Sequence, residues 1–267
     1  MVEHLPDAAP TRRGIAEWGL WLGLLLVLSP VLQHLVEHWI ASPWSLYSTA
    51  FIALLVLAAR ADAPVPPRPK EGAGLLAVAC LGQLFALKTN AVAVGRPFAA
   101  IAVLGMFLLR GTASLRTGLL VLWIVPFPTA VSIMLGGREI VQALYEMGAL
   151  LLEPLGMAFE FSTRHLSAGD NTLPLDPRRS GLVLATHMSG LAWYSGVRRK
   201  LDWQPTLRLI GGYVLLAAPI QFGVIVVSLV LLHFGSPGWT IEAVGTAGWL
   251  VPFAIVLARE WKRQEPE

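Results

Sequence analysis

Long apolar stretches separated by short charged segments are the feature that most constrains the fold of this chain. The stretches at residues 18–36, 118–135 and 209–234 contain no Asp, Glu, Lys or Arg. A helix needs about 20 mostly apolar residues to cross the hydrocarbon core of a bilayer. Backbone groups inside lipid must be paired with each other, which a helix achieves within one segment. The sequence therefore predicts a helical integral membrane protein.

Composition and charge agree with this prediction. Hydrophobic residues make up 55% of the chain and charged residues 14%, whereas about a quarter of the residues in a soluble domain are charged. The formal net charge is +3, but Lys and Arg lie in short segments beside apolar stretches, where they act as topology signals. We therefore expect membrane lipid as a partner and no nucleic acid. The single cysteine, Cys80, can form no intramolecular disulfide.

The predicted fold is an all-α polytopic transmembrane helical bundle that forms one integral membrane domain over residues 1–267. We expect N-terminal spans within residues 1–117 and a second part of the bundle at 118–267. Eight spans are predicted, at residues 18–36, 45–59, 72–87, 97–109, 118–135, 181–197, 209–234 and 246–258. The short pair 72–87 and 97–109 allows a second interpretation, a re-entrant pair in which Lys88 and Arg96 line an aqueous cavity. We instead expect both side chains to lie at the membrane interface, with their charged ends in water.

An amphipathic helix is predicted over residues 138–161. Apolar residues recur there at helical spacing, but Glu139, Glu146 and Glu153 interrupt them. Because three carboxylates make full insertion into lipid costly, we expect this helix to lie along the outer surface. A polar loop is expected after it, over residues 162–180.

The basic segments predict the orientation in the membrane. They flank the expected spans near residues 12, 60–70, 110–116, 198–200 and 259–263, whereas residues 235–245 contain no Lys or Arg. Cytoplasmic segments carry the excess of Lys and Arg in membrane proteins. Eight spans with both termini in the cytoplasm fit this pattern.

Four segments of the second half of the chain occur in a characteristic order. They read WIVPFPTAVSIMLGG at 123–137, LYEMGALLLEPLGMAFEF at 144–161, LVLATHMSGLAWYSG at 182–196 and VGTAGWLVPF at 244–253. From about Pro126 onward this order of features resembles the exosortase/archaeosortase family of membrane transpeptidases. The resemblance implies an exosortase-like core in the bacterial or archaeal cytoplasmic (inner) membrane. It also implies a binding site for the membrane-embedded C-terminal sorting tail of a substrate protein.

The chain departs from the family at the positions that the resemblance marks as catalytic. Met188 occupies the position of the cysteine nucleophile, and a thioether cannot form a thiolate. Val244 occupies the position of the family histidine, and the apolar stretch 209–234 contains no arginine. Cysteine, arginine and histidine are therefore all missing, and no intact catalytic set remains.

The candidate remnant of the catalytic pocket consists of His187, Met188, Ser189, Gln221 and Val244. Ser189 and His187 are two residues apart, so on a helix they point in different directions and do not form a nucleophile–base pair. Ser189 beside Gly190 is better explained by close helix packing. His187 is expected as a neutral imidazole bonded to a neighbouring helix, through Gln221 or Tyr194, with a functional role as the alternative.

Metal sites are less favoured than these explanations. His187 with Met188 has the ligand chemistry for copper or haem, and His34 with His38 has zinc spacing. No further ligand accompanies either pair in the sequence. We therefore expect no metal and no cofactor.

The favoured function is a non-catalytic accessory or assembly subunit that binds a membrane-embedded helix, either a sorting tail or a partner membrane protein. The alternative is an active exosortase-like membrane peptidase or transpeptidase with substituted residues, for which His187, Ser189, Gln221 and Glu242 are the candidates. A transporter or channel would require discontinuous helices and paired intramembrane charges, of which the sequence contains little.

Overall fold

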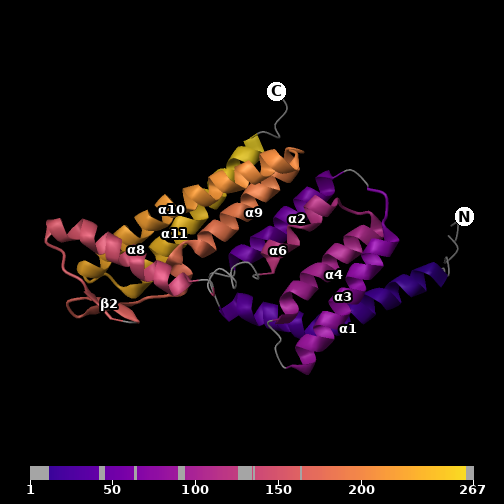
Figure 1. Ribbon diagram of the computed structural model, residues 1–267, viewed down its shortest axis with the longest axis horizontal. Coiled ribbons are helices and arrows are strands. Elements are labelled where there is room, and N and C mark those ends of the chain that lie inside the picture. Colours follow the sequence, from indigo (N-terminus) through magenta and orange to yellow (C-terminus); the bar gives the residue numbers. More distant parts are fainter. Residues whose placement is uncertain are drawn as a thin grey trace, which may run out of the picture.

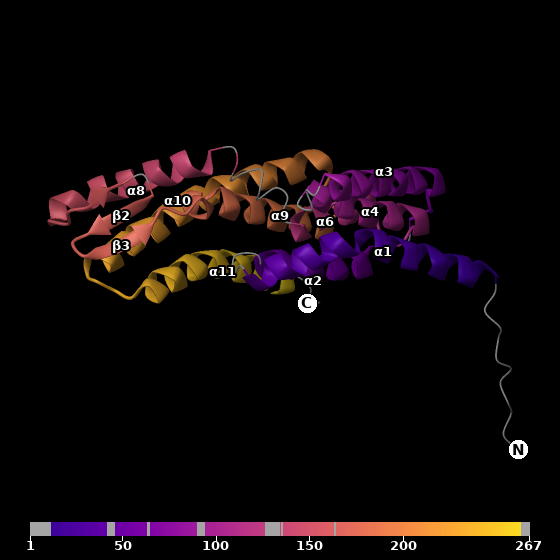
Figure 2. The same ribbon diagram turned by 90° about the horizontal axis from the view of Figure 1, so that it is seen from below.

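The computed structural model describes residues 12–41, 46–62, 65–89, 94–125, 134, 136–162 and 164–262 of the chain. This part is mostly helical (Figure 1). Its helices are α1 Arg12–Ala41, α2 Leu46–Ala61, α3 Pro69–Lys88, α4 Gly95–Arg110, α5 Leu115–Gly118, α6 Val121–Ile124, α8 Gly137–Leu152, α9 Leu182–Arg198, α10 Trp203–His233 and α11 Gly238–Lys262. In Figure 2, α11, α2 and α1 form one layer, and α8, α10, α9, α4 and α3 lie in a second layer above it.

Three helices of the described residues are long and apolar enough to cross a membrane. They are α3 over Pro69–Lys88, α10 over Trp203–His233 and the Gly238–Arg259 part of α11. Large apolar side chains such as Leu81, Leu215 and Val251 are exposed on them, at 68%, 75% and 56%. Lipid is the environment in which such exposure carries no cost, which indicates a membrane protein.

The prediction of eight membrane-length spans is wrong for the described chain. α2 and α4 have 16 residues each and α9 has 17, so they extend only about 24–26 Å at 1.5 Å per residue. The hydrocarbon core is about 30 Å thick. The expected span 118–135 is divided between the four-residue helices α5 and α6, and residues 126–133 of it lie outside the described part.

The segment predicted as an amphipathic helix over residues 138–161 is helical only as far as Leu152, as α8, which runs beside the C-terminal half of α10 (Figure 1). The prediction is wrong for the rest, because the 3-10 turn Glu153–Leu155 ends at Gly156, with a φ of +82°, and Glu160–Phe161 is a strand. Val141, Tyr145 and Leu152 are buried on the face that packs against Ile225 and Leu229 of α10. The opposite surface exposes Glu139, Glu146 and Glu153 together with Met147, Leu150 and Leu151. Acidic and apolar groups thus share the exposed side of this helix.

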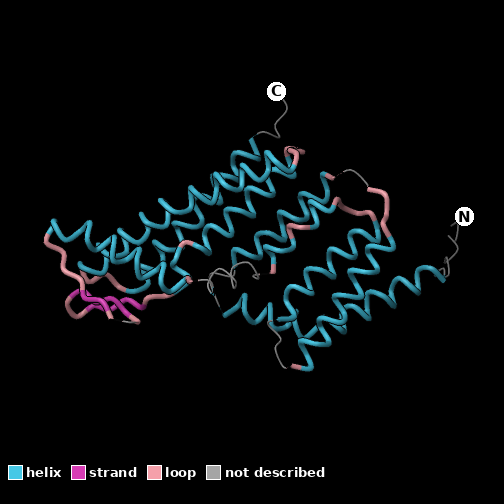
Figure 3. Tube along the Cα trace, in the orientation of Figure 1, coloured by secondary structure: helices cyan, strands magenta, loops and turns pink. Residues whose placement is uncertain are grey.

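A small sheet occupies the end of the predicted amphipathic helix and part of the predicted polar loop, so the all-α prediction is wrong here. Strands β1 Glu160–Phe161, β2 His165–Ala168 and β3 Asn171–Pro174 pair antiparallel in that order (Figure 3). Ala168 pairs with Asn171, which leaves Gly169 and Asp170 as a two-residue turn. Gly169 has a φ of +57°, which the tight hairpin turns require and glycine adopts without strain. Leu166 and Leu173 join the core that α8 and α10 share.

Helix α9 lies at the centre of the main core. This core joins Phe51 and Leu54 of α2, Leu120 and Val121, and Leu184, Met188 and Leu191 of α9. A Cβ atom on Gly190 would lie 2.6 Å from the ring of Phe51 and 2.7 Å from that of Trp123. Only a residue without a side chain allows α2 and α6 to approach α9 this closely.

Candidate functional site

The three consecutive candidates on α9 face three different neighbours. Successive residues of an α-helix are rotated by about 100°, so His187, Met188 and Ser189 cannot line one pocket together. His187 and Met188 are buried, with 5% and 2% exposed, and Ser189 is partly buried. Each side chain must therefore be followed to its own surroundings.

Met188 and Val244 line the same cavity. It has a volume of about 640 Å³ and lies where α9, α10 and α11 meet. Tyr213 and Arg259 are the polar side chains among its lining residues, and the rest of the lining is apolar or glycine, including Gly223, Val227, Gly248 and Val251. We call this cavity the apolar groove. The two positions that the sequence marked as the lost cysteine and the lost histidine thus meet in one space.

The apolar groove is open at its side. Val227 of α10 and Val251 of α11 line it and are 46% and 56% exposed. At the floor, Gly248 allows the two helices to touch, because a Cβ there would lie 2.2 Å from Cγ2 of Val224. Gly223 is different, since its Cβ position has no atom within 4 Å. The groove therefore has a closely packed floor and a vacant wall.

His187 points away from the groove toward α2. Its Nδ1 lies 2.8 Å from the carbonyl oxygen of Val183, one turn earlier in α9. Its ring stacks on Phe51 with 6.0 Å between ring centroids. The predicted partner Gln221 is engaged elsewhere, because its amide donates to the carbonyl of Arg179 at 2.8 Å. The Nδ1 of His187 and the Gln221 amide thus bond to other groups, so the Gln221 part of the prediction is wrong; the Tyr194 alternative stays a prediction.

Among the described residues, the hydrogen-bond partners of the Ser189 hydroxyl do not include a base. This hydroxyl donates to the carbonyl oxygen of Thr186 at 2.6 Å and lies 3.1 Å from the indole Nε1 of Trp123. A serine nucleophile requires a general base within hydrogen-bond reach of its oxygen. The observed partners instead hold Trp123 of α6 against α9, in agreement with the packing interpretation of Ser189 and Gly190.

The remaining candidates also stand apart from the groove. Glu242 is exposed on the first turns of α11 and is not among the groove's lining residues. Arg96 is buried with 8% exposed, and its guanidinium Nη2 lies 3.0 Å from Nδ1 of His34. This contact replaces the interfacial position expected for Arg96. Within the described ranges no three His, Cys, Asp or Glu side chains lie close enough to hold a metal ion.

Sequence reasoning missed a polar cluster at the end of the molecule that bears the basic turns. The Asp62 carboxylate accepts hydrogen bonds from the Thr117 hydroxyl at 2.6 Å and from the Ser114 backbone N–H at 2.8 Å. Arg116 donates to the carbonyl of Leu201 and, at 2.7 Å, to the hydroxyl of Thr206. The cluster thus joins the ends of α2 and α5 to the start of α10.

Two tryptophans complete this cluster. The Arg116 guanidinium lies 5.2 Å from the ring centre of Trp203 and 6.0 Å from that of Trp193. The indole of Trp193 donates to the carbonyl of Arg116 at 2.8 Å. The only sequence signal was an arginine followed by threonine in a short turn between apolar stretches, which looks the same as an ordinary topology signal.

The electrostatics of Asp62 follow from these contacts. Partial burial raises the pKa of the carboxyl, but the hydrogen bonds from Thr117 and Ser114, with the positive charge of Lys200, outweigh it. The pKa of Asp62 therefore lies below that of an ordinary aspartate. The carboxylate is charged at neutral pH and acts as an acceptor that holds the cluster together.

Comparisons of this chain with protein-family models, with curated proteins and with solved structures find no match. The geometry of the apolar groove is therefore the basis for the functional conclusion.

Proposed function

We propose that this protein is a non-catalytic, exosortase-like subunit that binds a transmembrane helix of a partner protein in the apolar groove. In this proposal the chain resides in the cytoplasmic membrane of a bacterium or archaeon, with both termini in the cytoplasm. The observation that carries the proposal is that Met188 and Val244 line one groove that opens at the side of α10 and α11.

The lining of the groove favours a helix over a polar substrate. Helices associate in membranes through close van der Waals packing, and small residues let their backbones approach. Gly223, Ala247 and Gly248 supply such positions, and Val227 and Val251 supply apolar side chains at the opening. A sorting tail or the span of a partner protein has the complementary shape and polarity.

The enzyme alternative finds less support in the same region. A thioether and an isopropyl group occupy the positions that would need a nucleophile and a base, and the hydroxyl of Ser189 is directed to Thr186 and Trp123. Cleavage of a sorting-tail substrate by the purified protein would overturn the proposal, provided that Ser189→Ala or His187→Ala abolished the cleavage.

Photo-crosslinking in native membranes tests the proposal directly. Benzoylphenylalanine at Val227 places the reactive ketone at the opening of the groove, and the same residue at Leu215, also on α10, is the control. Leu215 is 75% exposed but does not line the groove. We expect the Val227 variant alone to form an adduct whose crosslinked peptide maps to an apolar helix of one protein. Adducts of equal yield at both positions, or with lipid alone, would contradict helix binding.

A matched pair of glycine substitutions tests the same site without a reactive group. A Cβ on Gly223 or on Gly212 meets no atom within 4 Å, and both residues lie on α10. Gly223 lines the groove and Gly212 does not. We expect Gly223→Leu to fill the groove and abolish recovery of the crosslinked partner, while Gly212→Leu retains it. Equal recovery with both variants would show that the partner binds elsewhere.

A further inference from the structure

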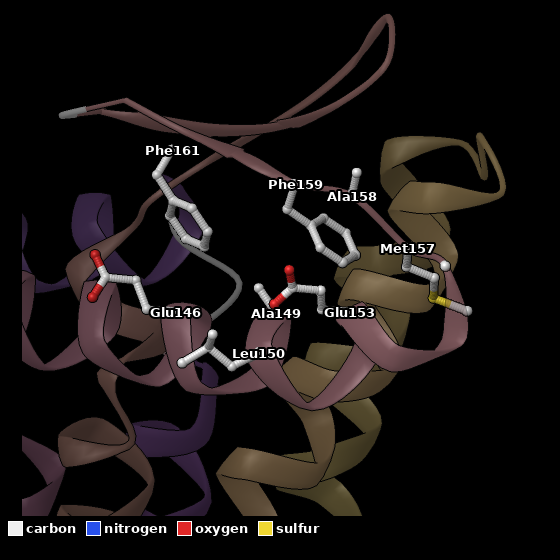
Figure 4. Close-up of a pocket in the computed structure, with 9 residues that line it drawn as sticks. Glu146, Ala149, Leu150, Glu153, Met157, Ala158, Phe159 and Phe161 are labelled. Carbon is white, nitrogen blue, oxygen red and sulfur yellow. The ribbon is translucent and has the colours of Figure 1, made fainter.

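A second cavity, unrelated to the apolar groove, lies between the end of α8 and the first strand of the sheet. Its volume is about 610 Å³, within the range of small-molecule sites. One wall carries Glu146 of α8 and Glu153, which follows α8 and begins the 3-10 turn Glu153–Leu155. The other wall carries the phenyl rings of Phe159, just before β1, and Phe161 in β1 (Figure 4). We call this cavity the acidic–aromatic cleft.

The residues that line the two walls of the cleft are spaced differently along the chain. Glu146 and Glu153 are seven residues apart, and the backbone at Glu153, the C-cap of α8, is still helical. Their Cα positions are therefore on one face and about 10 Å apart along the axis of α8. Phe159 and Phe161 alternate along an extended segment, so both rings lie on the same side of the chain. In Figure 4 the ring of Phe161 lies between the two carboxylates, and the ring of Phe159 lies beside Glu153. Two carboxylates on one wall thus face two phenyl rings on the other.

The charge of the cleft has no counterpart among its own lining residues. None of them is a lysine, arginine or histidine. An oxygen of Glu146 accepts a hydrogen bond from the amide of Gln142 at 2.8 Å, which leaves its charge in place. The cleft is therefore an electronegative site whose second wall also favours cations, because aromatic faces attract them.

We propose that the acidic–aromatic cleft binds a linear aliphatic diammonium compound, such as a polyamine. Each ammonium group would pair with one carboxylate, and the connecting methylene chain would lie against the rings of Phe159 and Phe161. Charge-assisted hydrogen bonds, cation–π contact and burial of methylene groups all act together on this one class of ligand. The spacing of the carboxylates selects compounds whose nitrogen atoms are about 10 Å apart.

Two other ligand classes fit the lining less well. A calcium ion takes six or more oxygen ligands, and two carboxylates on glutamates about 10 Å apart along one helix do not converge on one ion. A zwitterionic lipid headgroup would bring a phosphate beside Glu146 and Glu153, with no cation among the lining residues to receive it. A free diamine carries only positive charges, and the two carboxylates of the cleft complement them.

Titration calorimetry of the full-length protein in detergent tests the proposal with diaminoalkanes of increasing length. We expect the affinity to pass through a maximum near diaminoheptane, whose extended length matches the carboxylate spacing, and to fall for ethylenediamine and for longer chains. Magnesium chloride at the same concentration should not displace the diamine. Affinity that is independent of chain length, or displacement by magnesium at equal concentration, would overturn the proposal.

Glutamine variants identify the residues responsible. Glu146→Gln and Glu153→Gln keep the side-chain shape at exposed positions, and each should weaken diaminoheptane binding by about tenfold, as expected for loss of one charged hydrogen bond. Glu139→Gln is the matched control, because Glu139 is exposed seven residues before Glu146 on α8 but does not line the cleft. Unchanged binding in both cleft variants, or an equal loss with Glu139→Gln, would contradict the assignment.

Discussion

At the scale of single residues, Gly190 shows how closely the core is packed. Its Cβ position lies 2.6 Å from the Phe51 ring and 2.7 Å from that of Trp123. Overpacking a core costs about 1–3 kcal/mol, so Gly190→Ala should lower the thermal midpoint measured in detergent. Gly212→Ala has open space at its Cβ and should leave the midpoint unchanged or raise it. Equal midpoints for the two variants would show that α2 and α6 can move enough to accommodate a methyl group at residue 190.

Asp62 gives a prediction on pH. Its pKa is lowered in the fold, so the carboxylate stabilises the protein above the pKa of the unfolded chain, and this contribution is lost as the pH falls through the folded value. Below about pH 4, the wild-type midpoint should therefore fall more steeply than that of Asp62→Asn, which keeps an acceptor oxygen but has no charge to lose. Parallel pH profiles of the two proteins would contradict the role of the charge.

The order of motifs in the sequence placed Met188 and Val244 in one candidate site, and both residues line the apolar groove. That the groove is the remnant of a catalytic pocket stays a prediction. The surroundings of His187 and Gln221 could not be predicted in this way. The Nδ1 of His187 lies against a carbonyl oxygen of its own helix, and the Gln221 amide donates to Arg179. The rotation of each helix about its axis decides which groups are near, and hydropathy does not report it.

At the scale of elements, Arg116 of α5 couples its own segment to residues 201–206, which lead into and begin α10. Its guanidinium reaches the carbonyl of Leu201 and the hydroxyl of Thr206 and lies over Trp203. Lysine cannot reproduce this planar, multiply bonded contact. Arg116→Lys should therefore cost about 1–3 kcal/mol, seen as a lower midpoint in thermal unfolding. Arg208→Lys on the exposed side of α10 is the control and should have little effect.

Element positions were predicted well and element ends poorly. The predicted stretches 72–87 and 97–109 correspond to α3 Pro69–Lys88 and α4 Gly95–Arg110. Pro69 begins α3, and Gly111, with a φ of +65°, ends α4. Proline at the start of a helix and glycine after its end are boundary signals that a hydropathy profile does not detect. The hairpin β2–β3 was missed although Gly169 and Asp170 form a typical two-residue turn, because the alternating pattern around it is short.

At the scale of the whole molecule, the structure separates the main core from a second buried cluster. This cluster joins α8, the sheet and the C-terminal half of α10 around Tyr145 and Leu229. The main core surrounds α9, and the apolar groove lies at its edge. Hydropathy could not predict this division, because buried and lipid-facing residues of a membrane protein are equally apolar.

The orientation of this arrangement in the membrane gives the last prediction. Asp170, in the turn between β2 and β3, and Gln204, in the first turn of α10, are both exposed. They belong to opposite ends of α10, which is long and apolar enough to cross the bilayer. The basic residues at 198–200 predict a cytoplasmic position for Gln204 and an external position for Asp170.

Because Cys80 is the single cysteine, Cys80→Ser provides a background for labelling either position. We expect Asp170→Cys to react with an impermeant maleimide once the outer surface of the cytoplasmic membrane is accessible, and Gln204→Cys only after that membrane is permeabilised. Reversed labelling would place the acidic–aromatic cleft in the cytoplasm and invert the orientation. Labelling of both positions in sealed membranes would show that α10 does not separate them, and would remove the basis for a partner helix in the apolar groove.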